Sequence, residues 1–350
     1  MRGASFPGGR EVAFVELPDP TPRPGEVVIE IKASGMCGSD LHFYRRPKGA
    51  PLPVRHRFHD GPVICGHEPC GVIAALGASV PAGIGKVGDR VMVYHYAACG
   101  VCNHCRAGWQ QHCTDVPLHV YGNNDHGAHA QYIKVAAMAV LPLPGALSFT
   151  AGAAISCGTG TAYCALRRLA VSGNDTIAIF GQGPVGLAAT QFARAMGARV
   201  IAVDIHASRL ELSKSLGADA VIVAADPAHV EQAIRDLTHG KGADLSLDTS
   251  GAASARLSSI RCLRAWGKAC LVGEGGELTV DVSNDLLRKQ ATVVGSWTFS
   301  SVIQSECAQF AVDRGIDVDA VFTHRWRLED AAEAYRLFDG QAGGKGVFVF

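Results

Sequence analysis

The sequence lacks the features that direct a protein to nucleic acid or into a membrane. Lys and Arg number 32 of its 350 residues, and Asp and Glu also number 32, so neither charge is in excess. No apolar run approaches the roughly 20 residues that span a bilayer. The first segment, MRGASFPGGREVAFVELPDP, has no signal-peptide pattern. These absences predict a soluble cytoplasmic protein that binds neither nucleic acid nor membrane.

The length and the pattern of the chain predict two domains. A single core rarely grows to 350 residues. The middle of the chain alternates apolar β-branched runs with helical patterns at 184–196 and 208–216. Such alternation predicts an α/β domain with a doubly wound parallel sheet. Its six strands are expected at residues 176–180, 199–204, 219–223, 243–248, 268–273 and 291–296.

The first 150 residues have a different character. They are rich in Gly, Pro and short β-branched runs, which predicts an irregular, mostly β domain. The segment 343–350, GGKGVFVF, also has a strand pattern and follows the last strand of the six. We therefore expect it to return to the first domain. The basic, proline-containing loop at 44–62 is either a solvated loop or a contributor to substrate access.

A glycine-rich turn lies between the first two strands of the α/β domain. Gly181, Gly183 and Gly186 form G-x-G-x-x-G after a strand and at the start of a helix. That context predicts a dinucleotide site, because the turn and the helix N-terminus bind a pyrophosphate. Pro184 and Val185 complete the turn. A flavin or another nucleotide is the alternative ligand.

Asp204 ends the second strand of this domain. A carboxylate there accepts hydrogen bonds from the ribose hydroxyls and repels a 2′-phosphate, so it favours NAD over NADP. Arg209 lies nearby and is the residue type that accommodates that phosphate. Val272 and Gly273, at the end of the fifth strand, are weaker candidates for contact with the nicotinamide.

Twelve cysteines are many for a cytoplasmic protein. Four of them form C-x2-C-x2-C-x7-C, and the short steps allow their thiolates to converge on one ion. A closed set of four thiolates is typical of a structural zinc site. An iron–sulfur cluster and disulfides are the alternatives. The four residues are Cys99, Cys102, Cys105 and Cys113.

A second set of candidate metal ligands is spread over three segments. GMCGSDLH, CGHEPCG and SCGTGTAY contain Cys37, His67, Glu68 and Cys157. From the residues alone, the cysteines could be small buried side chains and the histidine a hydrogen-bonded core residue. Cys65 and Cys70 flank His67 and are alternative thiolate ligands, but they are interpreted as small buried side chains, as are Cys164, Cys262, Cys270 and Cys307. The histidines in loop-like regions are interpreted as solvated or hydrogen-bonded side chains: His56, His59, His119, His126 and His129.

Taken together, these motifs resemble the zinc-containing medium-chain alcohol dehydrogenases. The G-H-E motif, the four-cysteine segment, the glycine turn and the aspartate after the second strand occur in family order over essentially the whole chain. The resemblance implies a GroES-like domain at 1–151 and 298–350 and a Rossmann domain at 152–297. It also implies one structural zinc in the four-cysteine segment.

The resemblance assigns roles to individual residues. It implies that Cys37, His67 and Cys157 hold a catalytic zinc, with Glu68 on the ion or directly behind it. Asp40 would orient the ligand histidine. Ser39 and His42 would form a proton relay. Polyol and threonine dehydrogenase branches of the family tend to have a carboxylate where Cys157 stands, although other segments resemble those branches.

The sequence thus predicts an NAD-dependent zinc enzyme that oxidises a secondary alcohol or polyol to a ketone. Two zinc ions per chain and a homodimer or homotetramer, joined through the Rossmann sheets, are implied by the resemblance. An NADPH-dependent carbonyl reductase is one alternative. A non-enzymatic nucleotide-binding protein on the same fold is the other.

Overall fold

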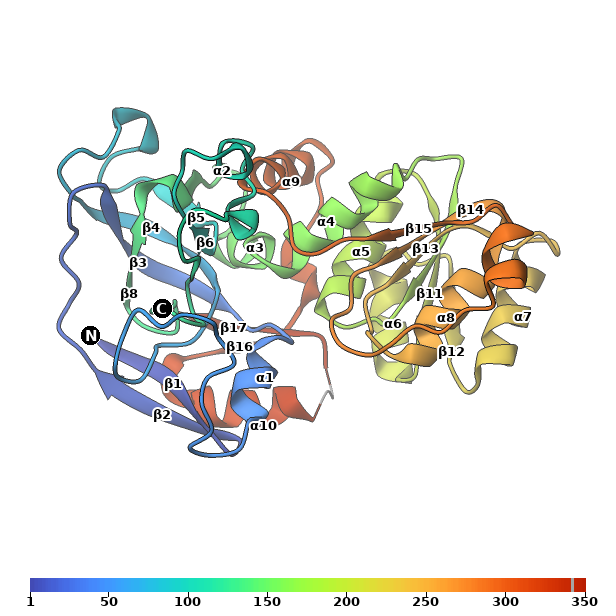
Figure 1. Ribbon diagram of the computed structural model, residues 1–350, viewed down its shortest axis with the longest axis horizontal. Coiled ribbons are helices and arrows are strands. Elements are labelled where there is room, and N and C mark those ends of the chain that lie inside the picture. The colour runs from blue at the N-terminus through green and yellow to red at the C-terminus, as the bar shows by residue number, and fades with distance from the viewer. Residues whose placement is uncertain (341–342) are drawn as a thin grey trace. The chain divides into compact units, whose positions relative to one another are not determined.

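A computed structural model describes residues 1–340 and 343–350 and divides the chain into two compact units (Figure 1). The first unit comprises Met1–Gly160 and Phe299–Phe350, and the second comprises Thr161–Thr298. The first unit extends beyond residue 151, where the sequence analysis placed its boundary. The reason is α3 (Phe149–Ile155), which packs against β3 (Glu26–Gly35) and β4 (Glu68–Leu76) of that unit.

The second unit contains the expected doubly wound α/β fold. Its parallel sheet has the strand order β12-β11-β10-β13-β14-β15. This is the order of dinucleotide-binding sheets, in which the chain starts in the middle and winds outward in both directions. The strands are β10 (Thr176–Phe180), β11 (Arg199–Asp204), β12 (Ala220–Val223), β13 (Ala243–Asp248), β14 (Leu263–Leu271) and β15 (Thr292–Gly295).

Five of these strands lie within one residue of their predicted bounds, and β14 does not. It begins at Leu263 instead of residue 268 and ends at Leu271 instead of residue 273. Leu263 pairs with Ala243 and Lys268 with Leu245, so extra residues bulge out of β14 between the two pairs. Trp266 has a φ of 64°, which turns the chain there. A hydrophobic pattern contains no signal for such an insertion.

Helices cover both faces of this sheet. α7 (Pro227–Leu237) and α8 (Ala253–Arg261) pack over Ala178, Phe180 and Ile201, which form one apolar face. α5 (Pro184–Ala195) contacts β10 and β11, and α6 (Ala207–Ser215) contacts β11 and β12. The unit begins within α4 (Gly158–Leu169). Its strands are therefore apolar on both faces, as expected for a parallel sheet between two helical layers.

The first unit is built on a seven-stranded sheet. Val27, Ile29 and Ile31 alternate along β3 and form its core with residues of the neighbouring strands. β17 pairs antiparallel with β3, so the C-terminal strand does return to this unit. The sheet has the order β16-β17-β3-β4-β5-β9, and β8 also pairs with β3. The strands not yet defined are β5 (Arg90–Val93), β8 (Tyr132–Ala136), β9 (Val140–Pro142), β16 (Phe322–Trp326) and β17 (Lys345–Val349).

Shorter elements surround this sheet. Two two-stranded sheets, one of β1 and β2 and one of β6 and β7, are separate from it. Their strands are β1 (Arg2–Gly8), β2 (Glu11–Glu16), β6 (Tyr96–Ala97) and β7 (His119–Val120), and the remaining helices are α1 (Asp40–Arg45), α2 (Asn103–Arg106), α9 (Ser301–Asp313) and α10 (Ala331–Asp339). Among residues 1–340 and 343–350, no helix combines the length and apolar character that crossing a bilayer requires.

Candidate active site and metal centres

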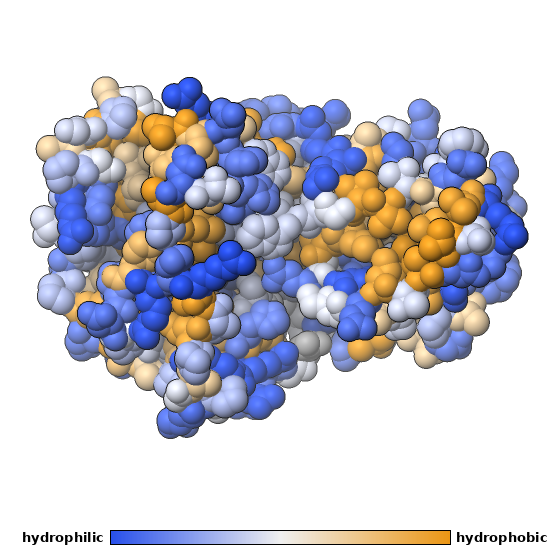
Figure 2. Space-filling model, in the orientation of Figure 1, coloured by the Kyte–Doolittle hydropathy of each residue, from blue (hydrophilic) through white to orange (hydrophobic). Residues whose placement is uncertain are grey.

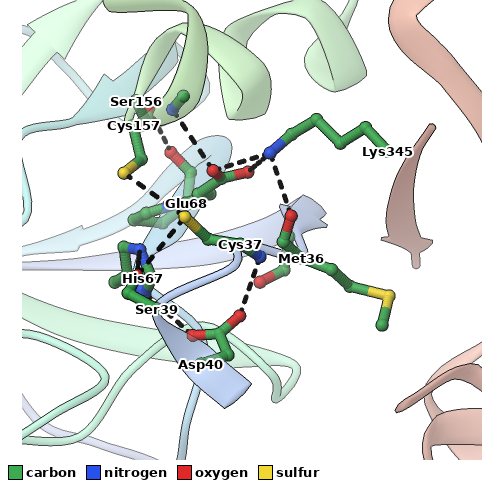
Figure 3. Close-up of polar contacts among 12 residues, drawn as sticks. Met36, Cys37, Ser39, Asp40, His67, Glu68, Ser156, Cys157 and Lys345 are labelled. Carbon is green, nitrogen blue, oxygen red and sulfur yellow. Dashed lines mark hydrogen bonds and ion pairs between the residues drawn. The ribbon is translucent and has the colours of Figure 1, made fainter. Parts of the chain in front are cut away.

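Three turns of the first unit bring the second set of candidate ligands together. Cys37 follows β3, His67 precedes β4, and Cys157 lies between α3 and α4. The pairing of Gly35 with Glu68 places the end of β3 beside the start of β4. Cys37 Sγ lies 3.8 Å from Cys157 Sγ. One donor atom from each of Cys37, His67, Glu68 and Cys157 lies within 4.8 Å of the others. Figure 3 shows the four side chains gathered around one point.

Asp40 holds two of these groups in place. Its Oδ1 lies 2.9 Å from His67 Nδ1, and its Oδ2 accepts a hydrogen bond from the Cys37 backbone N–H at 2.9 Å. Asp40 and His67 are both buried. Because Nδ1 faces the carboxylate, His67 Nε2 is the nitrogen left for a metal. The 2.9 Å separation supports the prediction that Asp40 orients His67, which stays a prediction.

The electrostatics of the cluster favour a thiolate at Cys37. The pKa of Cys37 is well below its ordinary value because Cys157 hydrogen-bonds it, and His67 adds to this against the effect of burial. The pKa of Cys157 is raised by the same contact. Burial acts to lower the pKa of His67, but the charges of Asp40 and Cys37 outweigh it and raise the pKa. Two cysteines and an imidazole around one point are ligands that suit zinc.

Glu68 is the fourth member of the cluster, and it pairs with a residue that the sequence analysis did not single out. Lys345 Nζ lies 2.7 Å from Glu68 Oε1 and 2.6 Å from Oε2, and it donates to Met36 O at 3.0 Å. Burial raises the pKa of Glu68, and the positive charge of Lys345 opposes that rise. An ammonium that contacts both oxygens has only donors to offer, and this contact favours the ionised carboxylate.

Ser39 lies at the cluster, and His42 does not. Ser39 Oγ is 3.3 Å from Cys37 Sγ and 3.2 Å from His67 Nε2. His42 is exposed on α1, one helical turn further along the chain. A hydroxyl beside His67 Nε2 is placed to exchange a proton with a group held at the candidate metal site. The relay from Ser39 to His42 remains a prediction.

The four-cysteine segment forms a separate cluster. Cys99, Cys102, Cys105 and Cys113 each offer a sulfur, and these sulfurs lie within 4.8 Å of one another. The contacts Cys99–Cys105 and Cys102–Cys113 are 3.7 and 4.0 Å long, far from the roughly 2.05 Å of a disulfide bond. The backbone N–H of Cys99 lowers the pKa of Cys113 to about 6. All four thiols are free, as a metal site requires.

The glycine turn of the second unit shows why each glycine is needed. Gly181 has a φ of 87°, which disfavours other residues. A Cβ on Gly186 would lie 1.8 Å from Gly181 O, so the helix must approach the strand without a side chain. A Cβ on Gly183 would meet nothing within 4 Å. The fold itself therefore does not require glycine at position 183, and the missing side chain leaves room for a pyrophosphate to approach the backbone.

Asp204 is tied to this turn. Its Oδ2 accepts from the Gln182 backbone N–H at 2.6 Å and its Oδ1 from that of His206 at 2.8 Å. Arg209 Nη1 lies 3.9 Å from Asp204 Oδ2. A carboxylate has about four lone-pair sites, so it can still accept bonds from a ribose. These contacts hold it rigidly at the end of β11.

Val272 and Gly273 lie directly beyond β14. Both of their backbone N–H groups donate to Asp248 O, at 2.9 and 3.1 Å. The residue after Asp248, Thr249, donates to Phe180 O at 2.9 Å. These contacts place Val272 and Gly273 at the same sheet edge as the glycine turn. No contact of theirs assigns them to a nicotinamide.

Several of the remaining cysteines and histidines have hydrogen-bond or ion-pair partners outside the two candidate metal sites. Cys65 Sγ donates to Ala4 O and Cys70 Sγ to Val91 O, both at 3.2 Å, and burial raises the pKa of each thiol. Neither is therefore a candidate ligand. Asp125 contacts two of the histidines, His59 and His119, and the latter lies in β7 rather than in a loop. The cysteines at 164, 262, 270 and 307 are buried in their units.

Sequence reasoning missed three buried residues around the cluster. Lys345 has been described above. His95 lies with its ring 5.2 Å from that of His67 and its Nδ1 2.9 Å from Ser156 O. Tyr335 donates to Asp40 Oδ2 at 2.9 Å. None belongs to a local motif, although a lysine inside the apolar strand KGVFV was a visible signal.

Comparisons with known proteins agree with this geometry. Residues 184–333 match the family described as zinc-binding dehydrogenase, and residues 23–145 match the alcohol dehydrogenase GroES-like domain. A zinc-type alcohol dehydrogenase-like protein of Escherichia coli K12 is 39% identical over 100% of this chain and 99% of its own. Sorbitol dehydrogenase of Bacillus subtilis 168 is 32% identical over 95% of this chain and 92% of its own length.

A solved structure agrees as well. A crystal structure from Escherichia coli CFT073, described as a short chain alcohol dehydrogenase complexed with the cofactor NADH, is 26% identical to this chain. Its TM-score is 0.85, and the match covers 100% of this chain and 99% of that one. The two family models, the full-length relatives and the shared two-part fold give one result. The chain belongs to the zinc-containing medium-chain alcohol dehydrogenase family.

Proposed function

We propose that the protein is an NAD-dependent enzyme that uses zinc to oxidise a secondary alcohol or polyol to a ketone. The convergence of Cys37, His67 and Cys157 beside the Ser39 hydroxyl is the observation that carries this proposal. Membership of an oxidoreductase family supports the reaction class. The named activity of the sorbitol dehydrogenase relative supports a polyol as the substrate.

The donor sets fit two zinc ions per chain. Cys37, His67 and Cys157, with Glu68 at hand, would hold the catalytic ion. The four cysteines from Cys99 to Cys113 would hold the structural ion, and they leave no open position. When bound, the catalytic zinc supplies a Lewis acid that lowers the pKa of a substrate hydroxyl, and NAD supplies the hydride acceptor.

The chain's own residues then orient the reactants and handle the proton. Asp40 holds His67 with Nε2 toward the ligand cluster. Ser39 Oγ, 3.2 Å from that nitrogen, accepts the proton of the substrate hydroxyl. The exposed His42 releases it to solvent. Gly183 and the N-terminus of α5 bind the pyrophosphate, and Asp204 binds the adenosine ribose.

Support for a homodimer or homotetramer comes from the second unit. β15 is one of the two edge strands of its sheet, and an exposed edge is a template for pairing with another copy. Figure 2 shows an apolar area in the region of β14 and β15. Exposed apolar side chains of this unit include Trp266, Val293 and Trp297. Val293→Lys should produce monomers in light scattering if the edges pair.

The test combines metal analysis with a substrate screen. We expect about two zinc ions per chain and NADH formation with secondary alcohols or polyols, abolished by a chelator. Cys37→Ala should retain one zinc and lose turnover. Cys70→Ala, a matched buried cysteine, should retain both. If Cys37→Ala keeps two zinc ions and full activity, the assignment of the catalytic site is wrong.

A further inference from the structure

A chain of buried hydrogen bonds extends from His67 away from the ligand cluster. After Asp40, the next member is Tyr335, whose hydroxyl donates to Asp40 Oδ2 at 2.9 Å. His129 Nε2 lies 2.7 Å from the Tyr335 oxygen, and Ser34 Oγ lies 2.7 Å from His129 Nδ1. Ser34, His129 and Tyr335 have no exposed surface, and Asp40 is 1% exposed. The chain is therefore shielded from water along its length.

The chemistry of the four groups fixes the direction of every bond. A carboxylate only accepts, so the single proton of Tyr335 goes to Asp40. The Tyr335 oxygen must then accept from His129 Nε2–H. Burial lowers the pKa of His129 to about 4, so this imidazole is neutral and its Nδ1 is an acceptor. Ser34 donates to that acceptor. One arrangement of protons therefore satisfies the whole chain.

This arrangement of protons constrains Asp40, the member of the chain that contacts the candidate ligands Cys37 and His67. Asp40 Oδ2 receives the Tyr335 hydroxyl and the Cys37 backbone N–H, and Oδ1 faces His67 Nδ1. The carboxylate is thus held from three directions and cannot rotate without breaking a buried hydrogen bond. A fixed carboxylate keeps the proton of His67 on Nδ1 and its lone pair on Nε2.

The packing around the chain shows that its rings are closely fitted. A Cβ on Gly66, the residue before His67, would lie 2.3 Å from His129 Nδ1. The Phe6 ring meets Tyr335 edge-on at 4.7 Å, and the Phe348 ring meets His129 edge-on at 4.6 Å. Neither His129 nor Tyr335 can turn away from its partner without displacing these neighbours.

We propose that Tyr335 and His129 are positioning residues that, through Asp40, fix the orientation and tautomer of His67 and so slow the loss of metal from the site. This inference rests on the proposed function, because it takes Cys37, His67 and Cys157 as zinc ligands. Removing the direct partner of a metal-binding histidine typically costs roughly 10–100-fold in metal affinity. One bond further away, we expect Tyr335→Phe to speed metal loss by roughly 3–10-fold.

The experiment measures zinc release from the full-length, zinc-loaded protein into an excess of a colorimetric zinc chelator. The phase that is absent from Cys37→Ala identifies the catalytic ion, and the remaining phase reports the four-cysteine site. Tyr335→Phe and Ser34→Ala test the chain at two distances. Tyr44→Phe is the matched control, because this buried tyrosine packs 5.7 Å from the Tyr335 ring but lies outside the chain of hydrogen bonds.

We expect the catalytic-site phase to be faster in Tyr335→Phe, less so in Ser34→Ala and unchanged in Tyr44→Phe, with the four-cysteine phase constant throughout. If both phases accelerate equally, the variants have merely loosened the fold and the inference is wrong. Equal release rates in Tyr335→Phe, Ser34→Ala and the parent would also overturn it. Should Tyr335→Phe not fold, Ser34→Ala decides alone. If Cys37→Ala loses no phase, the proposed function fails and this inference with it.

Discussion

Replacing Lys345 with methionine tests the buried ion pair that Lys345 forms with Glu68, one of the four candidate metal ligands. Lys345 and Glu68 have exposed side-chain fractions of 1% and 0% and lie 2.6 Å apart. Removing one partner of a buried pair leaves the other charge uncompensated, at about 3–5 kcal/mol. Glu68 can instead become protonated. At pH 7 this costs about 3 kcal/mol, because its ordinary pKa is 4.5 and each pKa unit is worth about 1.4 kcal/mol.

Whether Glu68 keeps its charge or becomes protonated, Lys345→Met should lose about 3–5 kcal/mol in the free energy of unfolding. The first unit has about 210 residues, so its unfolding temperature should fall by roughly 6–20 °C. If Glu68 is protonated, the folded variant holds a proton that the unfolded chain releases above pH 4.5. Lowering the pH from 7 toward 4.5 should then restore stability by about 1.4 kcal/mol per unit.

Urea unfolding followed by circular dichroism measures this effect. Lys134→Met is the control, because the Lys134–Glu26 pair in the same unit is partly exposed, at 29% and 26%, and should contribute about 1 kcal/mol or less. Adding Glu68→Gln to Lys345→Met should recover at least half of the loss, since no buried charge then remains. If the double variant is as unstable as Lys345→Met, or if both lysine variants lose equal stability, the reasoning fails.

Three further predictions concern other parts of the molecule. Cys102→Ala should lower the unfolding temperature, whereas Cys37→Ala should fold and bind NAD without turnover. Calorimetry and NAD titration distinguish these two outcomes. A fully stable but inactive Cys102→Ala would contradict the assignment of a structural role to the four-cysteine site and a catalytic role to the site of Cys37. Asp204→Ser should shift the ratio of kcat/KM values toward NADP by at least about tenfold, because it removes the carboxylate that repels a 2′-phosphate; a parent that already prefers NADP would refute this. Burial lowers the pKa of His129 to about 4 in the folded protein, against an ordinary value of 6.5, so between these pH values unfolding takes up a proton. The free energy of unfolding should therefore fall by up to about 3 kcal/mol as the pH drops from 6.5 to 4. In His129→Phe the slope of stability against pH should decrease, and an unchanged slope would show that His129 does not titrate in this way.

The features that could be predicted from the sequence depend on local chain chemistry. The strands β10 and β11 follow from runs of β-branched residues, and the turn between them follows from three glycines whose roles differ. Gly181 needs a positive φ and Gly186 a close approach to Gly181 O, so both leave a mark in a short segment. The four-cysteine segment is local for the same reason.

The support of the metal cluster could not be predicted, because it depends on pairing between distant segments. Lys345 reaches Met36 O only because β17 lies antiparallel beside β3, with Val347 opposite Gly35. No pattern within KGVFV specifies that partner. His129 likewise looks like a loop histidine in the sequence. It is buried because Tyr335, more than 200 positions away, packs over it.

The C-terminal segment contributes to the site from two sides. α10 supplies Tyr335, which fixes Asp40 and through it His67. β17 supplies Lys345, which holds Glu68 against the other end of the cluster. Both elements come after the whole second unit in the chain, and both pack into the first. The ligands thus come from residues 37–157, but the groups that orient two of them are added only when the chain returns. A segment that supplies none of the candidate ligands therefore contacts the groups that position two of them.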